Sequence, residues 1–497
     1  MRITNKMMTN NMMSNINRNK LSMTALEQQY STGKKIQKPS EDPIIAVRAL
    51  KLRTNLSELE QYHSKNIPDA KSWLDVTESS LTTVNEILSS VNTYCVQGST
   101  DTLTANDRSA IVENLEQLKQ QIYQEGNTNY AGRYVFTGYK TDSSLIFTAD
   151  TPNLTYSITE NFKGEQIQNV NKTIGGYELS DFDTPETFDN APKFVQSYRL
   201  QLSYDGLNAA LPSGLGYSIK NSLGDVVEQL PLPITRSCSL EDAGAYTPDG
   251  GEINYIYETG EIILGEEIYQ TLRNAVNINT TYTKTGFSNG DLKPEHYFNC
   301  TMTDSEKPEQ DPITFTKEAQ KIQYEVNFNQ RLTINTEGSA AFSHQIGRSI
   351  SDIMNAVNEV IAVENIITQV EGRLKDTSIS ETDKARYQKM KQQLDTELEL
   401  KKEIMQNAFE KGNTISSAEQ DRVNIAVADL GSRYVRLELT EERLSSQKVD
   451  FEELLSSNED ADITETIIKY SSAETIYNAS LSAAAKVVQS TLLDYLR

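Results

Sequence analysis

The chain has 497 residues, which is too long for a single hydrophobic core and predicts two or three domains. Its hydrophobic fraction of 37% is low for a compact enzyme and suits elongated helical packing with much exposed surface. The formal net charge of −23 argues against nucleic acid as a main partner.

Positive charge is concentrated near the start of the chain, where residues 1–53 carry ten Lys or Arg against three Asp or Glu. This basic arm favours an acidic protein surface or an anionic membrane, or it is simply the solvated face of a helix. The three cysteines have no metal-binding or redox spacing. No apolar run is long enough for a signal peptide or a membrane span, so we expect neither a cleaved signal nor membrane insertion.

The first predicted helix runs from about residue 5 to Tyr30. Its seam positions alternate between steps of four and three residues, which is the pattern of a coiled coil. The predicted seam consists of Met12, Ile16, Asn19, Met23, Leu26 and Tyr30. Asn19 either fixes register and partner number, as a polar seam residue can, or marks a place where the helix packs loosely.

Two further helices are predicted before residue 130. Helix resumes near Ile44, and a second seam with the same spacing runs from Ala70 to Cys95. Thr104 and Asp107 have the spacing of a capping box, so a third helix is expected to begin there.

The middle of the chain has a different pattern. From Tyr134 the hydrophobic period is two, Phe136 continues the alternation, and short β-like runs extend to about residue 335. Ten of the thirteen prolines fall between residues 152 and 312. The last strands are expected to form a hairpin around Asn329 and Gln330.

Helical periodicity returns near Ile346 and breaks near residues 377–382. Ser416 and Glu419 have capping-box spacing, so we expect a separate helix to begin there. An acidic break at 458–462 precedes the last helix and is well placed to cap the N-terminus of that helix. The expected interface residues of the last helix are Tyr477, Leu481, Ala484, Val488, Leu492 and Tyr495. Compatible helices at the two ends predict that the termini pair with each other.

The sequence therefore predicts an α+β fold. We expect an elongated multi-helix coiled-coil rod formed by the paired N- and C-terminal segments, with a central β-rich insertion.

No motif in the chain indicates catalysis. The three histidines are not in a zinc-protease arrangement, and no P-loop or nucleophile elbow occurs. The acidic pairs Asp181/Asp183 and Asp460/Asp462 do not continue into calcium-binding loops. We therefore expect no enzyme, no catalytic residue, no metal and no cofactor.

Several segments resemble a known family. The start MRITNKMM and the segment Ser31–Leu50 are similar to the N-terminal signature shared by flagellins and flagellar hook-associated protein 3. The segment NTNYAGRYVFTGYKT at Asn127–Thr141 resembles the hook-associated branch. Further similarity lies in the segments TINTEGSAAF, LGSRYVRLE, LSSNEDADITETIIKY and STLLDYLR. Nothing in the resemblance covers residues 148–320.

The resemblance implies a structural adaptor between hook and filament, outside the cell. Its expected partners are copies of itself in a ring, another hook-associated protein on the hook side and flagellin on the filament side. It also implies type III export without a cleaved signal, with a cytoplasmic chaperone bound to the C-terminal helix beforehand.

The resemblance also implies a division of the chain. The expected domains are an inner coiled-coil helix and export segment at 1–43, helical rod at 44–147, a β-rich insertion at 148–320, hairpin and rod at 321–457, and a second inner helix at 458–497. Two alternatives remain open: flagellin itself, which polymerises along the filament, and a cytoplasmic coiled-coil scaffold. An enzyme-bearing flagellin variant is remote.

Overall fold

The computed structural model describes residues 5–100, 103–176, 192–220, 224–242, 244–376 and 379–493, with side chains as far as Lys486. Helices and strands both contribute, so the predicted α+β class is confirmed. The helices are α1 Asn5–Thr32, α2 Pro43–Gln61, α3 Ile67–Gly98, α4 Ala105–Glu125, α5 Glu266–Leu272, α6 Gly338–Ala341, α7 His344–Leu374, α8 Glu381–Glu459 and α9 Ile463–Leu493.

The strands lie between α4 and α6. They are β1 Asn129–Tyr130, β2 Arg133–Tyr134, β3 Thr151–Phe162, β4 Gln168–Ile174, β5 Lys193–Gln201, β6 Leu215–Lys220, β7 Val226–Leu232, β8 Arg236–Cys238, β9 Ile253–Ile256, β10 Glu261–Leu264, β11 Asn277–Phe287, β12 Asn299–Asp304, β13 Ile313–Phe315, β14 Gln323–Asn327 and β15 Gln330–Thr333.

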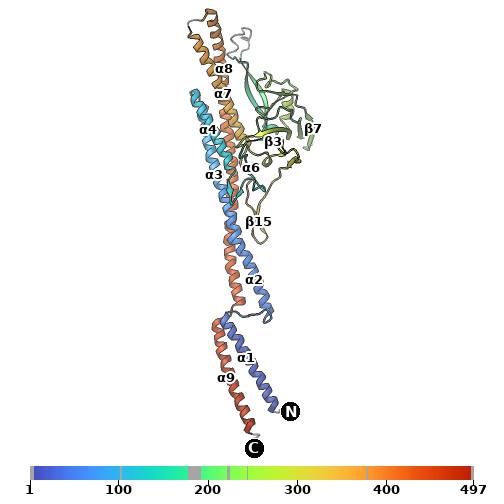
Figure 1. Ribbon diagram of the computed structural model, residues 1–497, viewed down its shortest axis with the longest axis vertical. Coiled ribbons are helices and arrows are strands. Elements are labelled where there is room, and N and C mark those ends of the chain that lie inside the picture. Colours follow the sequence, from blue (N-terminus) through green and yellow to red (C-terminus); the bar gives the residue numbers. More distant parts are fainter. Residues whose placement is uncertain are drawn as a thin grey trace. The chain divides into compact units, whose positions relative to one another are not determined.

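The chain forms two compact units. The first contains Met1–Ala70, Tyr324–Leu332 and Val435–Arg497, and the second contains Lys71–Gln323 and Thr333–Tyr434. In the first unit α1 and α9 lie side by side and antiparallel, so that the two ends of the described chain are close together (Figure 1).

The first unit also pairs α2 with the end of α8. Asn458 Nδ2 donates a hydrogen bond to the carbonyl oxygen of Ile45 over 3.1 Å, and Lys448 Nζ lies 3.2 Å from Glu60 Oε1. Asp42 caps α2, because its Oδ1 accepts hydrogen bonds from the first turn at 2.9 and 3.2 Å. A carboxylate also complements the positive end of the helix dipole.

The helices of the second unit bury the seam predicted between residues 70 and 95. Leu81, Val84, Leu88 and Val91 are all at most 1% exposed. At about 25 cal/mol per Å² of apolar area removed from water, burial of this kind stabilises each such side chain by about 1.5–3 kcal/mol. Helix α4 contacts α7.

Two larger sheets make up most of the β part of the second unit, which also contains the two-stranded sheet of β1 and β2. The first has the order β13-β12-β3-β11-β6-β7, and the second has the order β4-β5-β10-β9-β8, with β8 parallel to β9. One apolar core joins them, since Ile158 and Ile278 of the first sheet and Leu200 and Ile262 of the second are fully buried in the same cluster.

Most of the predicted helix ends agree with the structure. Thr104 and Asp107 form the predicted capping box, with the Asp107 backbone N–H 3.3 Å from Thr104 Oγ1. The break expected near 377–382 lies between the end of α7 and the start of α8.

The prediction of a separate helix at Ser416 is wrong, because α8 is continuous over 79 residues. Ser416 is fully buried, and its Oγ donates to the carbonyl oxygen of Leu88 over 3.1 Å. Its hydroxyl is therefore satisfied by the neighbouring helix α3 and does not cap a helix end.

Two details of the predicted β region also differ from the structure. Strand β2 ends at Tyr134, and Phe136 packs edge-on against Phe342 with ring centroids 4.9 Å apart. The β14–β15 hairpin turns at Phe328 and Asn329, one residue earlier than expected. Asn329 takes the left-handed φ of 55°, which asparagine tolerates well.

Candidate assembly surfaces

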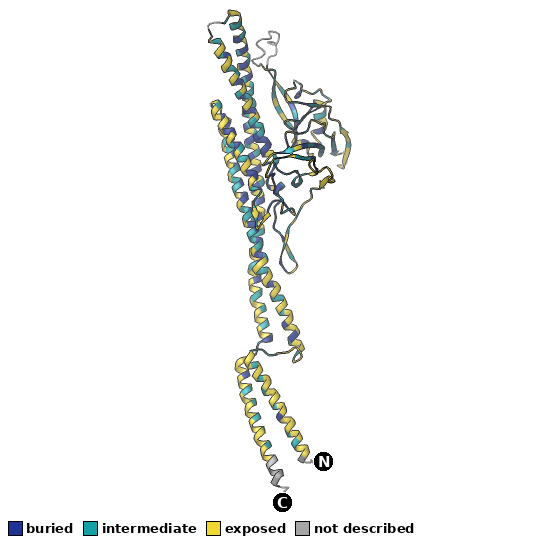
Figure 2. Cartoon of the chain, viewed as in Figure 1, coloured by how far each residue is buried: buried dark blue, intermediate teal, exposed yellow. Residues whose placement is uncertain are grey.

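The contact between α1 and α9 involves one narrow face of each helix. On α1 the less exposed residues are Thr9, Met12, Ile16, Asn19, Met23, Leu26 and Gln29, and Ile16 is the most buried at 8% exposed. On α9 the corresponding residues are Thr466, Tyr470, Ala473, Tyr477, Ser480 and Ala484. Figure 2 shows that both helices are otherwise largely exposed.

The polar position in the first seam has a polar partner. Asn19 Nδ2 donates a hydrogen bond to Ser480 Oγ over 3.0 Å, and Ser480 Oγ donates to the carbonyl oxygen of Ile476 over 2.7 Å. Ser480 is absent from the predicted interface. It follows Tyr477 by three residues, so the same spacing that found Tyr477 could have identified it.

The remaining predicted interface residues are distributed differently. Tyr477 and Ala484 lie on the contacting face, whereas Tyr30 and Leu481 are exposed by 50% and 42%. Leu481 follows Ser480, whose Oγ accepts the hydrogen bond from Asn19, so its side chain leaves the helix about 100° further round the axis. The side chains of Val488 and Leu492 lie beyond the described side chains, and Tyr495 lies outside the described residues.

Large apolar side chains at other positions around the two helices are uncovered. We call them together the terminal apolar surface; its members are 42–71% exposed and are Met7, Met8, Met13, Leu21, Tyr30, Ile463, Ile467, Ile468, Ile476 and Leu481. Large apolar side chains exposed in this number favour an interaction site. This surface could therefore dock against another helix.

A short two-stranded joint closes the other end of the α1–α9 pair. We call residues 33–35 and 459–461 the joint. The backbone N–H of Lys35 donates to the carbonyl oxygen of Glu459, and that of Ala461 donates to Gly33, each over 2.8 Å. Gly33 has a φ of +70°, which is accessible to glycine without strain.

Charged side chains reinforce the joint. Glu459 is 5% exposed and accepts a hydrogen bond from Arg53 Nε over 3.1 Å, and Lys34 Nζ lies 3.0 Å from its Oε1. Lys34 Nζ also donates to Asp460 Oδ1 over 2.5 Å. Burial alone would raise the pKa of Glu459, but the hydrogen bonds from Arg53 and Lys34 lower it. The hydrogen bond from Lys34 likewise lowers the pKa of Asp460.

The joint also accounts for one of the acidic pairs in the sequence. Asp460 pairs with Lys34, and Asp462 Oδ1 accepts a hydrogen bond from the backbone N–H of Glu465 over 3.0 Å at the start of α9. The expectation that this segment caps a helix N-terminus is confirmed. Asp181 and Asp183 lie outside the described residues.

Two histidines and the three cysteines are possible reactive groups, but their surroundings shift their pKa values away from catalytic use. His296 Nε2 lies 3.2 Å from the carbonyl oxygen of Ser144, and burial lowers the pKa of His296 to about 4. Burial among aromatic rings lowers the pKa of His344 to about 3. All three cysteines are buried, and burial raises the pKa of Cys95 to about 12. Neither a neutral, buried imidazole nor a protonated thiol is arranged here as an acid, a base or a nucleophile.

Two broader observations concern metals and membranes. Across residues 5–100, 103–176, 192–220, 224–242, 244–376 and 379–493, no group of three or more His, Cys, Asp or Glu side chains is arranged to hold a metal ion. Within these same segments, no helix combines the length and apolar character needed to span a bilayer.

Comparison with known proteins identifies flagellar relatives. Residues 3–141 match the model of the bacterial flagellin N-terminal helical region. Flagellar hook-associated protein 3 of Salmonella typhimurium is 32% identical over 145 residues, which are 29% of this chain and 45% of that protein. A flagellin of Clostridium tyrobutyricum is 32% identical over 126 residues, which are 25% of this chain and 33% of that protein.

Several solved structures overlap much of the chain at low identity. FlgL of Xanthomonas campestris overlaps 82% of this chain and 99% of its own length, at 13% identity and a TM-score of 0.32. That overlap is too distant to support a conclusion about function. The sequence matches cover less than half of each relative's length. They nevertheless confirm the resemblance to flagellins and to flagellar hook-associated protein 3, with residues 3–141 as the flagellin-type N-terminal helical region.

Proposed function

We propose that this protein is a structural adaptor that joins the hook to the filament of a bacterial flagellum. The observation that carries the proposal is the 32% identity to flagellar hook-associated protein 3 over 145 residues. The terminal apolar surface supports it, because a subunit that docks on its neighbours must present such a surface before assembly.

In this proposal the two ends of the chain, residues 1–43 and 458–497, form an inner coiled coil. Residues 44–147 and 321–457 form the surrounding helical rod, and 148–320 form an outer β-rich domain. The contact of α1 with α9 and the Asn19–Ser480 hydrogen bond support the first part. All strands of the two larger sheets lie between residues 151 and 315, which supports the last part.

The proposed partners follow from the flagellar relatives. Copies of the chain would form a ring, with another hook-associated protein on the hook side and flagellin on the filament side. A cytoplasmic chaperone would hold the C-terminal helix before type III export without a cleaved signal, and the assembled ring would lie outside the cell. In the ring, Met12, Ile16, Asn19, Met23, Leu26, Tyr30, Tyr477, Leu481, Ala484, Val488, Leu492 and Tyr495 would be interface residues.

The proposed role is not enzymatic. The relatives are named as structural components of the flagellum, which is consistent with a protein that is not an enzyme. The burial of His296 and of all three cysteines supports the same conclusion.

Flagellin is the second candidate function. The 32% identity to a flagellin over 126 residues favours it as the alternative, since flagellins and hook-associated protein 3 share the N-terminal helical region. A flagellin would occupy every position along the filament, whereas an adaptor would occupy one narrow band.

Immunogold electron microscopy of intact flagella separates these functions, with an antibody raised against residues 148–320. The adaptor role predicts label confined to the place where hook meets filament. Label along the whole filament would identify a flagellin. Signal only inside the cell would reject both and leave a cytoplasmic scaffold.

A further inference from the structure

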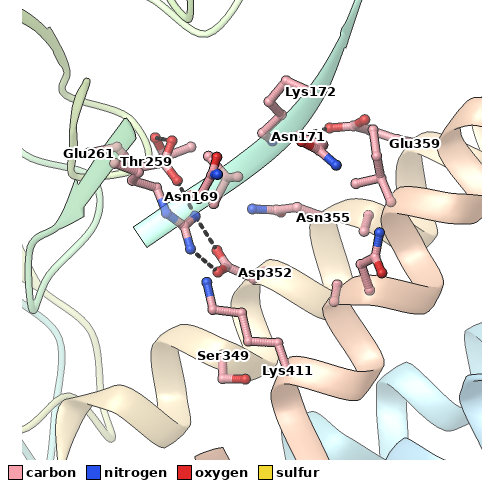
Figure 3. Close-up of a pocket in the computed structure, with 16 residues that line it drawn as sticks. Asn169, Asn171, Lys172, Thr259, Glu261, Ser349, Asp352, Asn355, Glu359 and Lys411 are labelled. Atoms are coloured by element: carbon pink, nitrogen blue, oxygen red, sulfur yellow. Dashed lines mark hydrogen bonds and ion pairs between the residues drawn. The ribbon is translucent and has the colours of Figure 1, made fainter. Parts of the chain in front are cut away.

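A polar cavity lies within the second unit, between strand β4 and helices α7 and α8. Its volume is about 310 Å³, at the lower end of the roughly 300–1,000 Å³ of small-molecule sites. Figure 3 shows the side chains of Asn169, Asn355 and Lys411 gathered around it from these three elements. The assembly role proposed above does not use this cavity.

The floor of the cavity is a rigid charged network centred on Arg199. Arg199 is 3% exposed, and its Nη1 lies 2.5 Å from Glu261 Oε1 while its Nη2 lies 2.7 Å from Asp352 Oδ2. Gln201 Nε2 donates to Asp352 Oδ1 over 3.2 Å. Glu261 accepts further hydrogen bonds from Tyr246 and Thr259, so the network holds its own position without a ligand.

The charges that line the cavity balance one another. Three cations, Arg199, Lys411 and Lys172, stand against three carboxylates, Glu261, Asp352 and Glu359. Lys172 Nζ lies 3.9 Å from Glu359 Oε1. Because the lining has no net charge, it offers neither an anion nor a cation a strong electrostatic advantage.

Four solvent-exposed asparagines stand around the cavity: Asn169 and Asn171 on β4, Asn355 on α7 and Asn407 on α8. Within the described part of the chain, none of these four amides has a side-chain hydrogen-bond partner. Each amide can donate and accept at once, as each hydroxyl of a sugar can. Lys411 Nζ has one partner, Gln168 Oε1 at 2.5 Å, and keeps two donors.

Apolar side chains and a neighbouring cavity complete the site. Val170, Ala356 and Ala408 contribute apolar surface to the lining, against which the C–H face of a sugar ring can pack. A second cavity of about 260 Å³ shares Lys172 and Glu359 with the first and continues along β4. We call these two adjacent cavities the groove; the paired side chains of Lys172 and Glu359 lie where they meet.

We propose that this groove is a binding site for a short neutral saccharide, whose hydroxyl groups are held by the four asparagine amides and Lys411. The balanced charge, the unpaired amides and the extended shape each favour an uncharged, hydroxyl-rich ligand over an ion. The saccharide is either free in solution or the end of a surface glycan.

Saturation-transfer NMR with the full chain tests for binding of free maltose, lactose and cellobiose. Binding of the full chain to immobilised neutral glycans is measured separately. Asn355→Ala should weaken binding about 30-fold, because this amide would make two hydrogen bonds to the ligand and each is worth about 1 kcal/mol. Asn358→Ala is the matched control, since Asn358 is an exposed asparagine on the same helix that does not line the cavity. Circular dichroism confirms that both variants fold.

The outcomes are separable. Binding to free disaccharides that survives Asn358→Ala and is lost in Asn355→Ala supports a soluble saccharide, and the same pattern on glycans alone supports a glycan terminus. No saturation transfer with any sugar, equal loss in both variants, or preferential binding of a peptide or a charged metabolite overturns the proposal. Because the inference does not depend on the adaptor role, its failure would leave the immunogold result unaffected.

Discussion

The joint at residues 33–35 and 459–461 can be loosened by one substitution. In Glu459→Gln the side chain keeps its size, but Arg53 and Lys34 lose the carboxylate that they bind. A buried hydrogen bond to a charged group contributes about 1.5–3 kcal/mol. Because the side chains of Lys34 and Arg53 are 42% and 57% exposed, solvent screens part of this, and we expect a net loss of about 1–2 kcal/mol.

The effect should be local and can be measured at two amides. The backbone N–H groups of Lys35 and Ala461 donate across the joint, so their hydrogen exchange reports its opening. A loss of about 1–2 kcal/mol predicts exchange about 5- to 30-fold faster at both amides. Glu453→Gln is the control, because Glu453 is an exposed carboxylate on the same helix. Unchanged exchange at Lys35 and Ala461 in Glu459→Gln would refute the reasoning.

The same reasoning gives the pH dependence of the joint. The pKa values of Glu459 and Asp460 are lower than their ordinary values, so the folded state favours the ionised carboxylates. Their contribution is therefore fully present above the ordinary carboxyl pKa of about 4 and is lost as the pH falls through the lowered values. The protection factors of the two joint amides, which are corrected for the intrinsic exchange rate at each pH, should fall below about pH 4, and Glu459→Gln should weaken this dependence.

Three further pairs of substitutions test the packing. Asn19→Leu should raise the helix content of the monomer measured by circular dichroism, because a polar seam residue costs stability; exposed Asn17→Leu should not. Arg199→Met should lower the free energy of unfolding in urea by about 3–5 kcal/mol, because it leaves the buried carboxylate of Glu261 without its cation. Arg236→Met, at a partly exposed ion pair, should lower it by at most about 1 kcal/mol. Gly431→Ala should stabilise α8 by about 0.5–1 kcal/mol, because a Cβ there meets open space. Gly412→Ala should destabilise α8, because a Cβ there lies 2.6 Å from Ile353 Cδ1. A urea unfolding midpoint that is higher for Gly412→Ala than for Gly431→Ala would contradict this.

Short-range sequence patterns predicted two of the helix starts correctly. The capping box at Thr104 and the acidic cap at Asp462 depend on hydrogen bonds that span three residues, so the sequence alone contains both partners. The same pattern was misleading at Ser416, where the decisive partner is Leu88 on another helix. Spacing cannot distinguish a hydroxyl that caps its own helix from one that bonds a neighbour.

The polar cavity could not have been predicted in this way. Arg199, Asp352 and Lys411 come from a strand and two helices that are widely separated in the chain, and none belongs to a short motif. Their approach depends on the order of strands in the second sheet and on where that sheet meets α7 and α8. Strand order is set by packing between distant segments, which hydrophobic alternation does not encode.

The terminal helices should gain most of their stability only on assembly. Among the described side chains, Ile16 is the one buried residue of α1 and Thr466 the one buried residue of α9. Ordering a residue costs about 1–2 kcal/mol, and such limited burial offsets little of that cost. We therefore expect rapid hydrogen exchange over residues 1–30 and 463–497 in the monomer, and slow exchange around the buried Leu81 and Leu88 of α3.

Assembly should reverse this difference, because docking would cover the terminal apolar surface. Protection over the two ends should rise when the chain is added to purified hooks, while α3 stays unchanged. Uniformly high protection of both ends in the monomer would mean that the α1–α9 contact is already sufficient. The exposed Leu21 and Ile468, 71% and 65% accessible, would then need an explanation other than docking.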